Sequence, residues 1–429
     1  MLETIRNAWK IPELRKKLLF VIGCIVVYRF GYTIFVPYVD TAMLTEVFRA
    51  QADTLIGYFN VLSGGGFSEA SIFALSVYPY INASIIMQLL QIAIPALERM
   101  VKDGGEEGRK KIASITRYVT VLLGIITGFS YYMLLRANQV LTRTDAWSAI
   151  VIVLTFTAGS AFIMWLGEQI NQKGIGNGIS IILFCGIVSR GPSMVQSLVT
   201  GLQTGTLNIV KTILILLIAI AMITFIVFIT NAERRIPVQY AKRVVGRKMY
   251  GGQSSHIPIK VNMSGVMPII FASAILSIPS TIGTFLPGLN NQTDHPFWYA
   301  FFHLFHSNSW FYAVMYFILI IMFNYFYVAI QYNPVEIANN LRNNNGAIPG
   351  YRPGKPTSDF ITKVLGKITF TGALFLGVVA SLPSIISMIT GLPVSLGGTS
   401  LLIVVGVALD TSRSLESYML MRHHKGFLE

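Results

Sequence analysis

Ten long apolar runs dominate this sequence of 429 residues and limit what it can fold into. They are Leu18–Val36, Ile72–Pro95, Val119–Leu135, Ala149–Leu166, Ile179–Leu202, Leu207–Thr230, Gly265–Leu286, Trp310–Ile330, Ile368–Ile389 and Ser400–Ser417. A helix needs about 20 predominantly apolar residues to cross the hydrocarbon core of a bilayer. Because backbone polar groups in lipid must be satisfied internally, runs of this length predict helices rather than a barrel. We therefore predict an all-α integral membrane protein with ten transmembrane helices.

The composition argues against an ordinary soluble enzyme. Charged residues make up 12% of the chain and the mean hydropathy is +0.60, whereas a soluble domain carries about 25% charged residues. Taken alone, a net charge of +14 would suggest a protein that binds nucleic acid, but the apolar content points first to a membrane protein. The two cysteines, Cys24 and Cys185, lie inside apolar runs and predict neither a disulfide framework nor a metal site.

The basic residues predict how the helices are oriented. With both termini in the cytoplasm, 27 of the 33 Lys and Arg residues lie in cytoplasmic segments. Such an excess marks the cytoplasmic side of a membrane protein. We therefore expect a multi-pass protein with both termini cytoplasmic, and this orientation explains most of the net charge without nucleic acid.

Two cytoplasmic loops, residues 231–262 and 332–367, are longer than the topology requires. Connections between elements are typically about 4–6 residues long. The basic residues in these loops could serve only to fix the topology, but the prolines and glycines among them indicate shaped hairpins. Shaped basic loops on one side suggest a docking surface for an acidic or nucleic partner.

Ten helices with a long break near the middle also suggest two halves of five helices. We place these halves at residues 1–202 and 203–429. Such halves are often inverted repeats, with the functional path at their interface.

A polar island, Tyr58–Ser71, precedes the second long run and reads YFNVLSGGGFSEAS. It is too short to cross a membrane and too apolar for a free loop. One interpretation is a re-entrant turn at the surface, and the other is a small helix folded back into a cavity on a glycine hinge. Irregular backbone at membrane depth must be buried or line a cavity.

The second run combines an apolar pair with polar side chains. Val77 and Ile81 are four residues apart and share one helix face. Asn82, Ser84 and Gln88 place polar groups on neighbouring faces. Polar groups in lipid are costly unless they face protein or water. They predict either hydrogen bonds between helices or a face along an interface that opens.

Motifs for bond chemistry are absent from the sequence. It contains no HExxH, GxSxG or Walker run. We therefore predict that the protein is not an enzyme and holds no cofactor or metal. A secondary transporter with a five-plus-five repeat is the alternative function, but ion-coupled carriers place several ionisable groups at mid-depth, where this chain has few. An intramembrane protease would need a nucleophile and base within the spans, and no span shows them.

Several long motifs resemble the bacterial SecY family, whose members form the centre of the Sec protein-conducting channel. They are SIFALSVYPYINASIIMQLL, WLGEQINQKGIGNGIS, ERRIPVQYAKRVVGRKMYGGQSSHIPIKVN, QYNPVEIANNL, IPGYRPGKPT and GGTSLLIVVGVALD. The resemblance covers nearly the whole chain. It implies two pseudo-symmetric five-helix halves that form a clamshell around a central pore, with a lateral gate to lipid between the second and seventh spans.

The resemblance also implies roles for individual residues. The pore ring would comprise Val77, Ile81, Ile179, Leu183, Ile270 and Ile403. A plug helix over about residues 57–67 would include Tyr58, Asn60, Gly64, Gly65, Gly66 and Phe67. Asn82, Gln88 and Ile278 would line the lateral gate, and Arg243, Arg247 and Arg352 would contact a motor or ribosome.

The function implied is protein translocation across the bacterial plasma membrane. Unfolded secretory polypeptides would cross through the pore, and signal sequences and transmembrane segments would leave sideways through the gate into lipid. The expected partners are the SecE and SecG subunits, the SecA motor ATPase, the ribosome, signal peptides, secretory polypeptides and membrane lipids. Contact with nucleic acid would be limited to ribosomal RNA.

Overall fold

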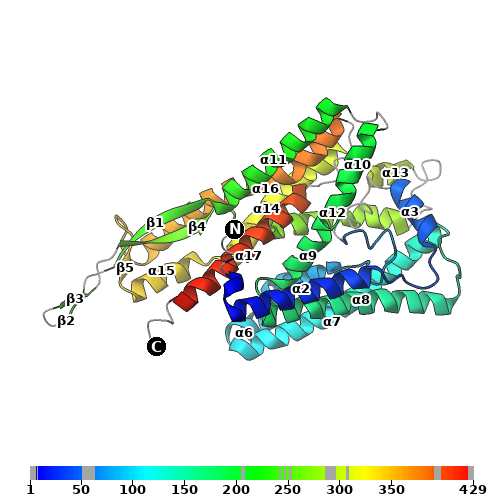
Figure 1. Cartoon of the computed structure of the whole chain (residues 1–429). Helices are drawn as coiled ribbons and strands as arrows, with labels where there is room; N and C mark the ends of the chain where they lie inside the picture. Colours follow the sequence, from blue (N-terminus) through cyan, green and yellow to red (C-terminus); the bar gives the residue numbers. More distant parts are fainter. Residues whose placement is uncertain are drawn as a thin grey trace. The chain divides into compact units, whose positions relative to one another are not determined.

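The computed structural model describes ten parts of the chain: residues 6, 8–50, 63–203, 208–240, 243–245, 248–250, 254–285, 296–305, 309–390 and 398–423 (Figure 1). They form two compact units. Unit 1 comprises Met1–Thr212, Ser277–Ser309 and Val407–Glu429, and unit 2 comprises Ile213–Leu276 and Trp310–Gly406. The halves 1–202 and 203–429 divide the chain differently and stay a prediction.

Each of the ten predicted spans overlaps at least one helix. In chain order these helices are α2 (Pro12–Tyr32), α5 (Tyr78–Ala93), α7 (Gly105–Ala137), α8 (Ala146–Lys173), α9 (Gly178–Val188) with α10 (Gly191–Gln203), α11 (Ile209–Asn231), α12 (Met267–Phe285), α14 (Trp310–Gln331), α16 (Lys355–Thr390) and α17 (Gly398–His423). Shorter helices are α3 (Thr41–Ala50), α6 (Pro95–Lys102), α13 (Pro296–Leu304) and α15 (Pro334–Asn343). Within the described ranges, five helices are long and apolar enough to cross a membrane, and α5 with α6 would make a sixth.

The second and fifth spans are not continuous helices. The prediction that the second span is helical from Ile72 is wrong, because α5 begins only at Tyr78. Ser76, two residues before this start, has a left-handed φ of 48°, which a right-handed helix excludes. After α5 the chain bends by 103° into α6. Ile94, between the two helices, is extended, because the ring of the following Pro95 disfavours helical backbone at the residue before it. The fifth span breaks between α9 and α10.

Unit 1 contains a closely packed pair of helices, α7 and α8. A methyl group on Gly124 would approach the Thr157 side chain to 3.2 Å, and one on Gly128 would lie 3.3 Å from the Val153 carbonyl oxygen. Small residues at such contacts let helix backbones approach closely in a membrane. The apolar core beside this contact includes Tyr131 and Phe156, both buried.

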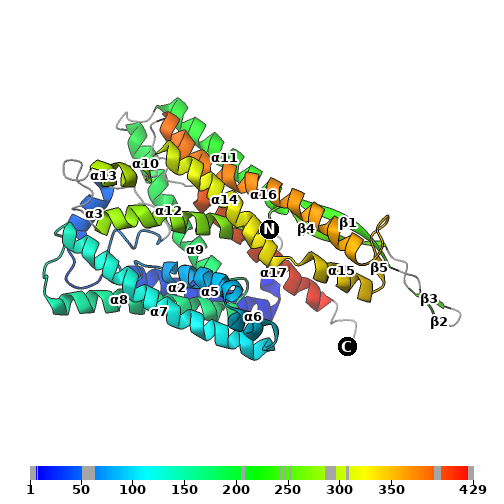
Figure 2. The same cartoon turned by 180° about the vertical axis from the view of Figure 1, so that it is seen from behind.

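Unit 2 contains a three-stranded antiparallel sheet in the order β4-β1-β5, packed near α15 and α16 (Figure 2). The strands are β1 (Glu233–Tyr240), β4 (Ser254–Lys260) and β5 (Gly346–Ala347), and β2 (Arg243–Val245) pairs separately with β3 (Lys248–Tyr250). The shaped hairpin expected in residues 231–262 is therefore present. The buried Asn324 on α14 donates to the Thr369 carbonyl at 2.8 Å and accepts from Ser264, which holds the segment between β4 and α12 against α14 and α16.

The close approach of α8 to the chain before α5 generates a test. A methyl group on Gly159 would lie 1.9 Å from the Ile72 carbonyl oxygen, a backbone atom that cannot rotate away. We expect Gly159→Ala to lower the free energy of unfolding by about 1–3 kcal/mol through overpacking. Thermal unfolding of the purified protein in detergent measures the change.

The matched control is Gly23→Ala in α2, where an added methyl group would meet no described atom within 4 Å. This control should leave the stability unchanged or raise it by up to about 1 kcal/mol, since Ala favours helix over Gly. Equal unfolding temperatures for the two variants would show that the close approach is absent.

Candidate functional site

A buried non-helical stretch, Ser63–Val77, lies in unit 1 and is called the turn segment below. Ser63, Ala70, Ser71 and Val77 are each at most 2% exposed. Its backbone is partly satisfied by an antiparallel bridge: the Val36 N–H donates to the Ala70 carbonyl at 2.9 Å, and the Ile72 N–H donates to the Ile34 carbonyl at 3.0 Å. This bonding makes irregular backbone tolerable inside a membrane protein.

Glycines are required where the turn segment begins. Gly64 and Gly65 have φ values of 68° and 96°, which disfavour any residue with a Cβ. A methyl group on Gly66 would lie 2.3 Å from the Tyr32 ring, and one on Gly64 would lie 2.8 Å from the Gly186 carbonyl oxygen. These contacts fix the start of the turn segment between α2 and α9.

Aromatic side chains hold the rest of the turn segment. The Phe67 and Tyr131 rings lie 4.2 Å apart, and the Tyr131 hydroxyl donates to the Phe67 carbonyl. On the α2 side, the hydroxyls of Tyr28 and Tyr32 lie 2.8 Å apart, and both rings pack on Phe73. A buried tyrosine hydroxyl requires a partner, so these residues define one arrangement of the segment.

The turn segment delivers Val77 and Ile81 to the start of α5. Val77 is the N-cap residue and not part of the helix, yet the Ile81 N–H donates to its carbonyl at 3.0 Å, so the one-turn spacing is kept. Ser160 on α8 donates to the Ser76 carbonyl at 3.0 Å and fixes this junction. Val77 is fully buried and Ile81 is half-buried.

The motif GIGNGIS positions Ile179 and Leu183 on α9. The Asn171 side chain accepts from the Gly178 N–H at 2.7 Å, and Asn177 caps the helix by accepting from the Ser180 N–H at 3.3 Å. A methyl group on Gly178 would lie 2.1 Å from the Gly167 carbonyl oxygen. The glycines therefore serve close packing of α8 on α9.

The remaining predicted ring residues belong to unit 2. Ile270 is half-buried on α12, and Ile403 is 3% exposed on α17. The structure thus describes Val77, Ile81, Ile179 and Leu183 in one unit and Ile270 and Ile403 in the other. That all six side chains surround one axis stays a prediction.

The described part of the predicted plug is not a helix. Residues Gly64 to Phe67 form turns, because the positive φ values of Gly64 and Gly65 are incompatible with a right-handed helix. Tyr58 and Asn60 lie outside the described residues. Ser63–Phe67 therefore forms turns, as in the first interpretation, but packs against α2, α7 and α9 within unit 1, which is closer to the buried position of the second.

The predicted gate and docking residues are placed only in part. Asn82 and Gln88 are half-buried on α5, and the Gln88 amide donates to the Ser84 hydroxyl at 3.4 Å. Ile278 belongs to α12. Arg243 begins β2 and Arg352 is exposed before α16, whereas Arg247 lies outside the described residues.

Sequence reasoning missed Tyr131, Tyr32 and Gly159 as residues that shape this site. Tyrosine inside an apolar run is a signal, because its hydroxyl must find a partner, but the partner is a backbone carbonyl 64 residues away in the case of Tyr131. No local pattern identifies that carbonyl.

Comparison with known proteins agrees with these features. The family model described as SecY matches residues 71–412. The "Protein translocase subunit SecY" of Thermotoga maritima is 43% identical over 100% of this chain and 98% of that protein. The proteins of the same name from Halalkalibacterium halodurans and Aquifex aeolicus are 42% and 38% identical, each over 100% of both chains.

Solved structures show the same fold. A structure titled "The structure of a protein conducting channel" matches with a TM-score of 0.66 at 18% identity, over 94% of this chain and 92% of that one. Sec61 in a canine ribosome-channel complex matches with a TM-score of 0.63 at 17% identity and the same coverage. The chain is therefore an all-α, multi-pass membrane protein with the fold of protein-conducting channels, as predicted. It belongs to the SecY family.

The contact between Tyr131 and the turn segment generates a second test. Tyr131→Phe keeps the ring but removes the hydrogen bond to the Phe67 carbonyl. We expect the free energy of unfolding to fall by about 1–3 kcal/mol, since a buried acceptor loses its donor. Hydrogen exchange of residues 63–77 should rise in the same variant.

Tyr118→Phe is the matched control, because Tyr118 lies on the same helix and is 77% exposed. It should change neither the unfolding temperature nor the exchange of the turn segment. If Tyr131→Phe behaved like this control, the hydroxyl would have no part in holding the segment.

Proposed function

We propose that this chain is the central, pore-forming subunit of a protein translocation channel in the bacterial plasma membrane, with both termini in the cytoplasm. The observation that carries the proposal is similarity over the full chain to proteins named "Protein translocase subunit SecY". The fold shared with protein-conducting channels supports it. The channel passes unfolded secretory polypeptides across the membrane and performs no bond chemistry.

The pore ring closes the resting channel to ions. Its proposed side chains are all aliphatic: Val77, Ile81, Ile179, Leu183, Ile270 and Ile403. A narrow hydrophobic constriction blocks hydrated ions by excluding water. Aliphatic side chains also deform around a passing chain without strong attraction to any one sequence, which suits a channel with many clients.

The plug adds a second barrier. We assign it to about residues 57–67, which include Tyr58, Asn60 and the start of the turn segment from Ser63 to Phe67. One of the structural relatives is titled as showing that the plug domain of SecY stabilises the closed state and maintains a membrane seal. The burial of Ser63–Phe67 and its attachment to Tyr131 and Tyr32 support a closed position for this segment.

The lateral gate lies between α5 and α12. Asn82 and Gln88 on α5 face Ile278 on α12 in this proposal. Polar side chains at this contact allow the two helices to separate and to close again, because these side chains can hydrogen-bond to protein or to water. An apolar signal segment leaves through the gate since each CH₂ moved from water to lipid contributes about 0.8 kcal/mol.

Pro279 within α12 lacks a backbone N–H and allows this helix to bend.

The driving energy comes from partners on the cytoplasmic side. We assign Arg243, Arg247 and Arg352 to the docking of the SecA motor or the ribosome, and SecE and SecG to the membrane part of the complex. One structural relative is a ribosome-bound Ssh1 complex of yeast, which supports the ribosome as a partner. No described feature favours the alternative of a secondary transporter.

A stalled secretory chain tests the pore. We replace Cys24 and Cys185 by serine, introduce Ile403→Cys, and arrest a precursor that carries a single cysteine in mid-translocation. On addition of an oxidant such as copper phenanthroline, the expected result is a disulfide between the precursor and position 403, because the ring must touch the chain it passes. Phe370→Cys is the control, since Phe370 is 54% exposed on α16 and should not react.

A disulfide at position 370 but not at 403 would contradict the pore assignment. Equal labelling of the two positions would also contradict it, because a specific path requires a difference between them.

Charge reversal tests the docking surface. The double variant Arg243→Glu with Arg247→Glu should lower SecA-dependent export at least tenfold while leaving the protein folded, because a reversed charge repels an acidic partner. The difference between the wild type and the double variant should shrink as the salt concentration rises, because salt screens the attraction that only the wild type has. Arg136→Glu at the end of α7, on the opposite predicted side, is the control. Undiminished export by the double variant would rule out these arginines as docking residues.

A further inference from the structure

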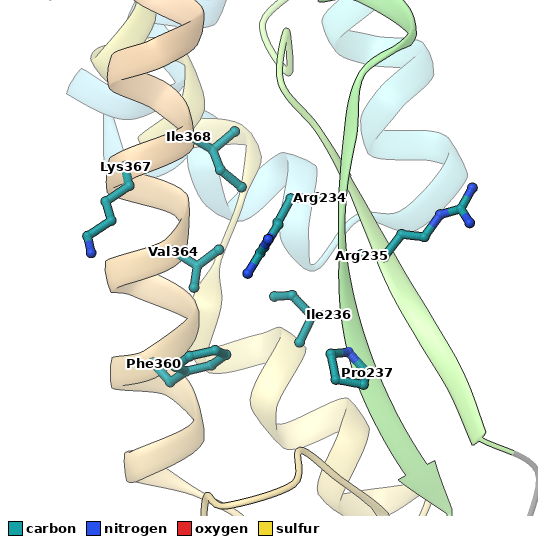
Figure 3. Close-up of a pocket in the computed structure, with 8 residues that line it drawn as sticks. All are labelled: Arg234, Arg235, Ile236, Pro237, Phe360, Val364, Lys367 and Ile368. Carbon is teal, nitrogen blue, oxygen red and sulfur yellow. The ribbon is translucent and has the colours of Figure 1, made fainter.

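Two features of the described chain have no part in the mechanism above. One is a groove of about 370 Å³ in unit 2, between strand β1 and helix α16, into which Arg234 projects while Arg235 points away (Figure 3). Nothing in the structure shows what covers this groove. The other is a group of unfavourable local features in the turn segment, where two residues have strained backbone and two hydroxyl groups are buried without a partner. Both kinds of feature raise the free energy of the folded segment.

The strained residues are Ala70 and Ser76, which have left-handed backbone with φ values of 45° and 48°. This conformation is unfavourable for residues that carry a Cβ. Each carbonyl accepts a hydrogen bond from another part of unit 1: the Val36 N–H donates to Ala70 at 2.9 Å, and the Ser160 hydroxyl donates to Ser76 at 3.0 Å. Strained backbone persists only where the surrounding contacts impose it. The strain is therefore released when the segment leaves these contacts.

The Ser71 hydroxyl is buried without a hydrogen-bond partner. Ser71 is 0% exposed, and its backbone N–H donates to the Gly66 carbonyl at 3.0 Å, but no described group bonds to its side-chain oxygen. The oxygen faces Gly66, since a methyl group added there would lie 2.6 Å from it and 2.3 Å from the Tyr32 ring. A hydroxyl in this position has lost its hydrogen bonds to water and gained none in exchange.

The Ser76 hydroxyl is in a similar position. Ser76 is 3% exposed, and the hydroxyls of Tyr28 and Tyr32 lie near it. Those two hydroxyls bond to each other at 2.8 Å, and neither meets the geometry of a hydrogen bond to Ser76. Because Ser71 has no such neighbours, it is the clearer position for a test.

We propose that these features set how readily the channel opens, because they make the closed turn segment only slightly more stable than the open one. When the segment leaves its closed position, water reaches the hydroxyls of Ser71 and Ser76, and Ala70 and Ser76 relax to ordinary backbone. A signal segment then needs to supply little binding energy to open the channel. The proposal rests on the translocation function proposed above, and it gives Ser71 a role in the opening equilibrium.

Ser71→Ala tests the buried hydroxyl, because alanine removes the oxygen and keeps the Cβ. We expect the closed segment to be favoured about tenfold more, since the unpaired hydroxyl no longer opposes it. In the full complex with its copurifying subunits, hydrogen exchange of residues 63–77 should slow by about this factor. In planar bilayers, the concentration of a synthetic signal peptide that gives half of the maximal conductance should rise by about the same factor, because apparent affinity follows the fraction of open channel.

Ser160→Ala is the matched control, since it removes the same atom from a hydroxyl that has a partner. It leaves the Ser76 carbonyl without this donor. Exchange of residues 63–77 should therefore accelerate, and less peptide should give half of the maximal conductance. Changes of the same sign in both variants, or no change in Ser71→Ala, overturn the proposal.

The exchange measurement also separates this proposal from the translocation function. If signal peptides opened no conductance in the wild-type complex, the translocation function would fail. The exchange rates of Ser71→Ala and Ser160→Ala would still decide whether the buried hydroxyl destabilises the closed segment, because they need no transport.

A second pair of variants tests the strained backbone. Ala70 and Ala74 are 0% and 1% exposed, so Ala→Gly removes an equally buried methyl group at both positions, but only Ala70 has left-handed backbone. Glycine relieves the strain at position 70 alone. Ala70→Gly should therefore need about tenfold more peptide than Ala74→Gly for half of the maximal conductance. An equal or lower requirement in Ala70→Gly would show that strain has no part in opening, and the proposal would be wrong.

Discussion

The requirement that backbone polar groups be bonded away from water governs this protein. Helices meet it automatically, which is why apolar runs become spans. The turn segment is the exception, and it persists because its peptide groups bond to the chain around Phe35 and to the Ser160 and Tyr131 side chains. Without those partners, each orphan group would cost several kcal/mol in lipid. A non-helical segment at this position is therefore possible only where it is packed against helices that supply these partners.

Close packing by small residues supports this exception. Gly159 and Gly167 on α8 leave room for the Ile72 carbonyl and for the Ile179 side chain, respectively. Hydrophobic driving force between helices is weak in lipid, so intimate contact replaces it. These contacts lie next to the starts of α5 and α9, where the proposed ring residues Val77 and Ile179 are found. Packing of α8 thus connects structural stability with the position of the proposed pore residues in unit 1.

Unit 2 depends on a polar clamp of comparable kind. Asn324 bonds to both Ser264 and Thr369, so the segment after β4 is tied to α14 and α16 before the chain enters α12. The β1–β4 hairpin and the proposed gate helix α12 are therefore joined by a short, anchored connection. Buried polar groups that are fully satisfied specify one arrangement, which suits a connection between a proposed docking surface and a proposed gate.

The sequence by itself determined the membrane class, the approximate positions of the ten spans and the presence of a shaped hairpin after Asn231. Hydrophobic length, proline and glycine act locally, so their effects can be predicted from neighbours along the chain. Resemblance to the family supplied the proposed site residues. Only the tertiary structure decided that α5 begins at Tyr78 and that Gly64 to Phe67 form turns. Those outcomes depend on contacts with Tyr32, Tyr131 and Ser160, which are distant in sequence, and no local pattern encodes which distant group a buried carbonyl will meet.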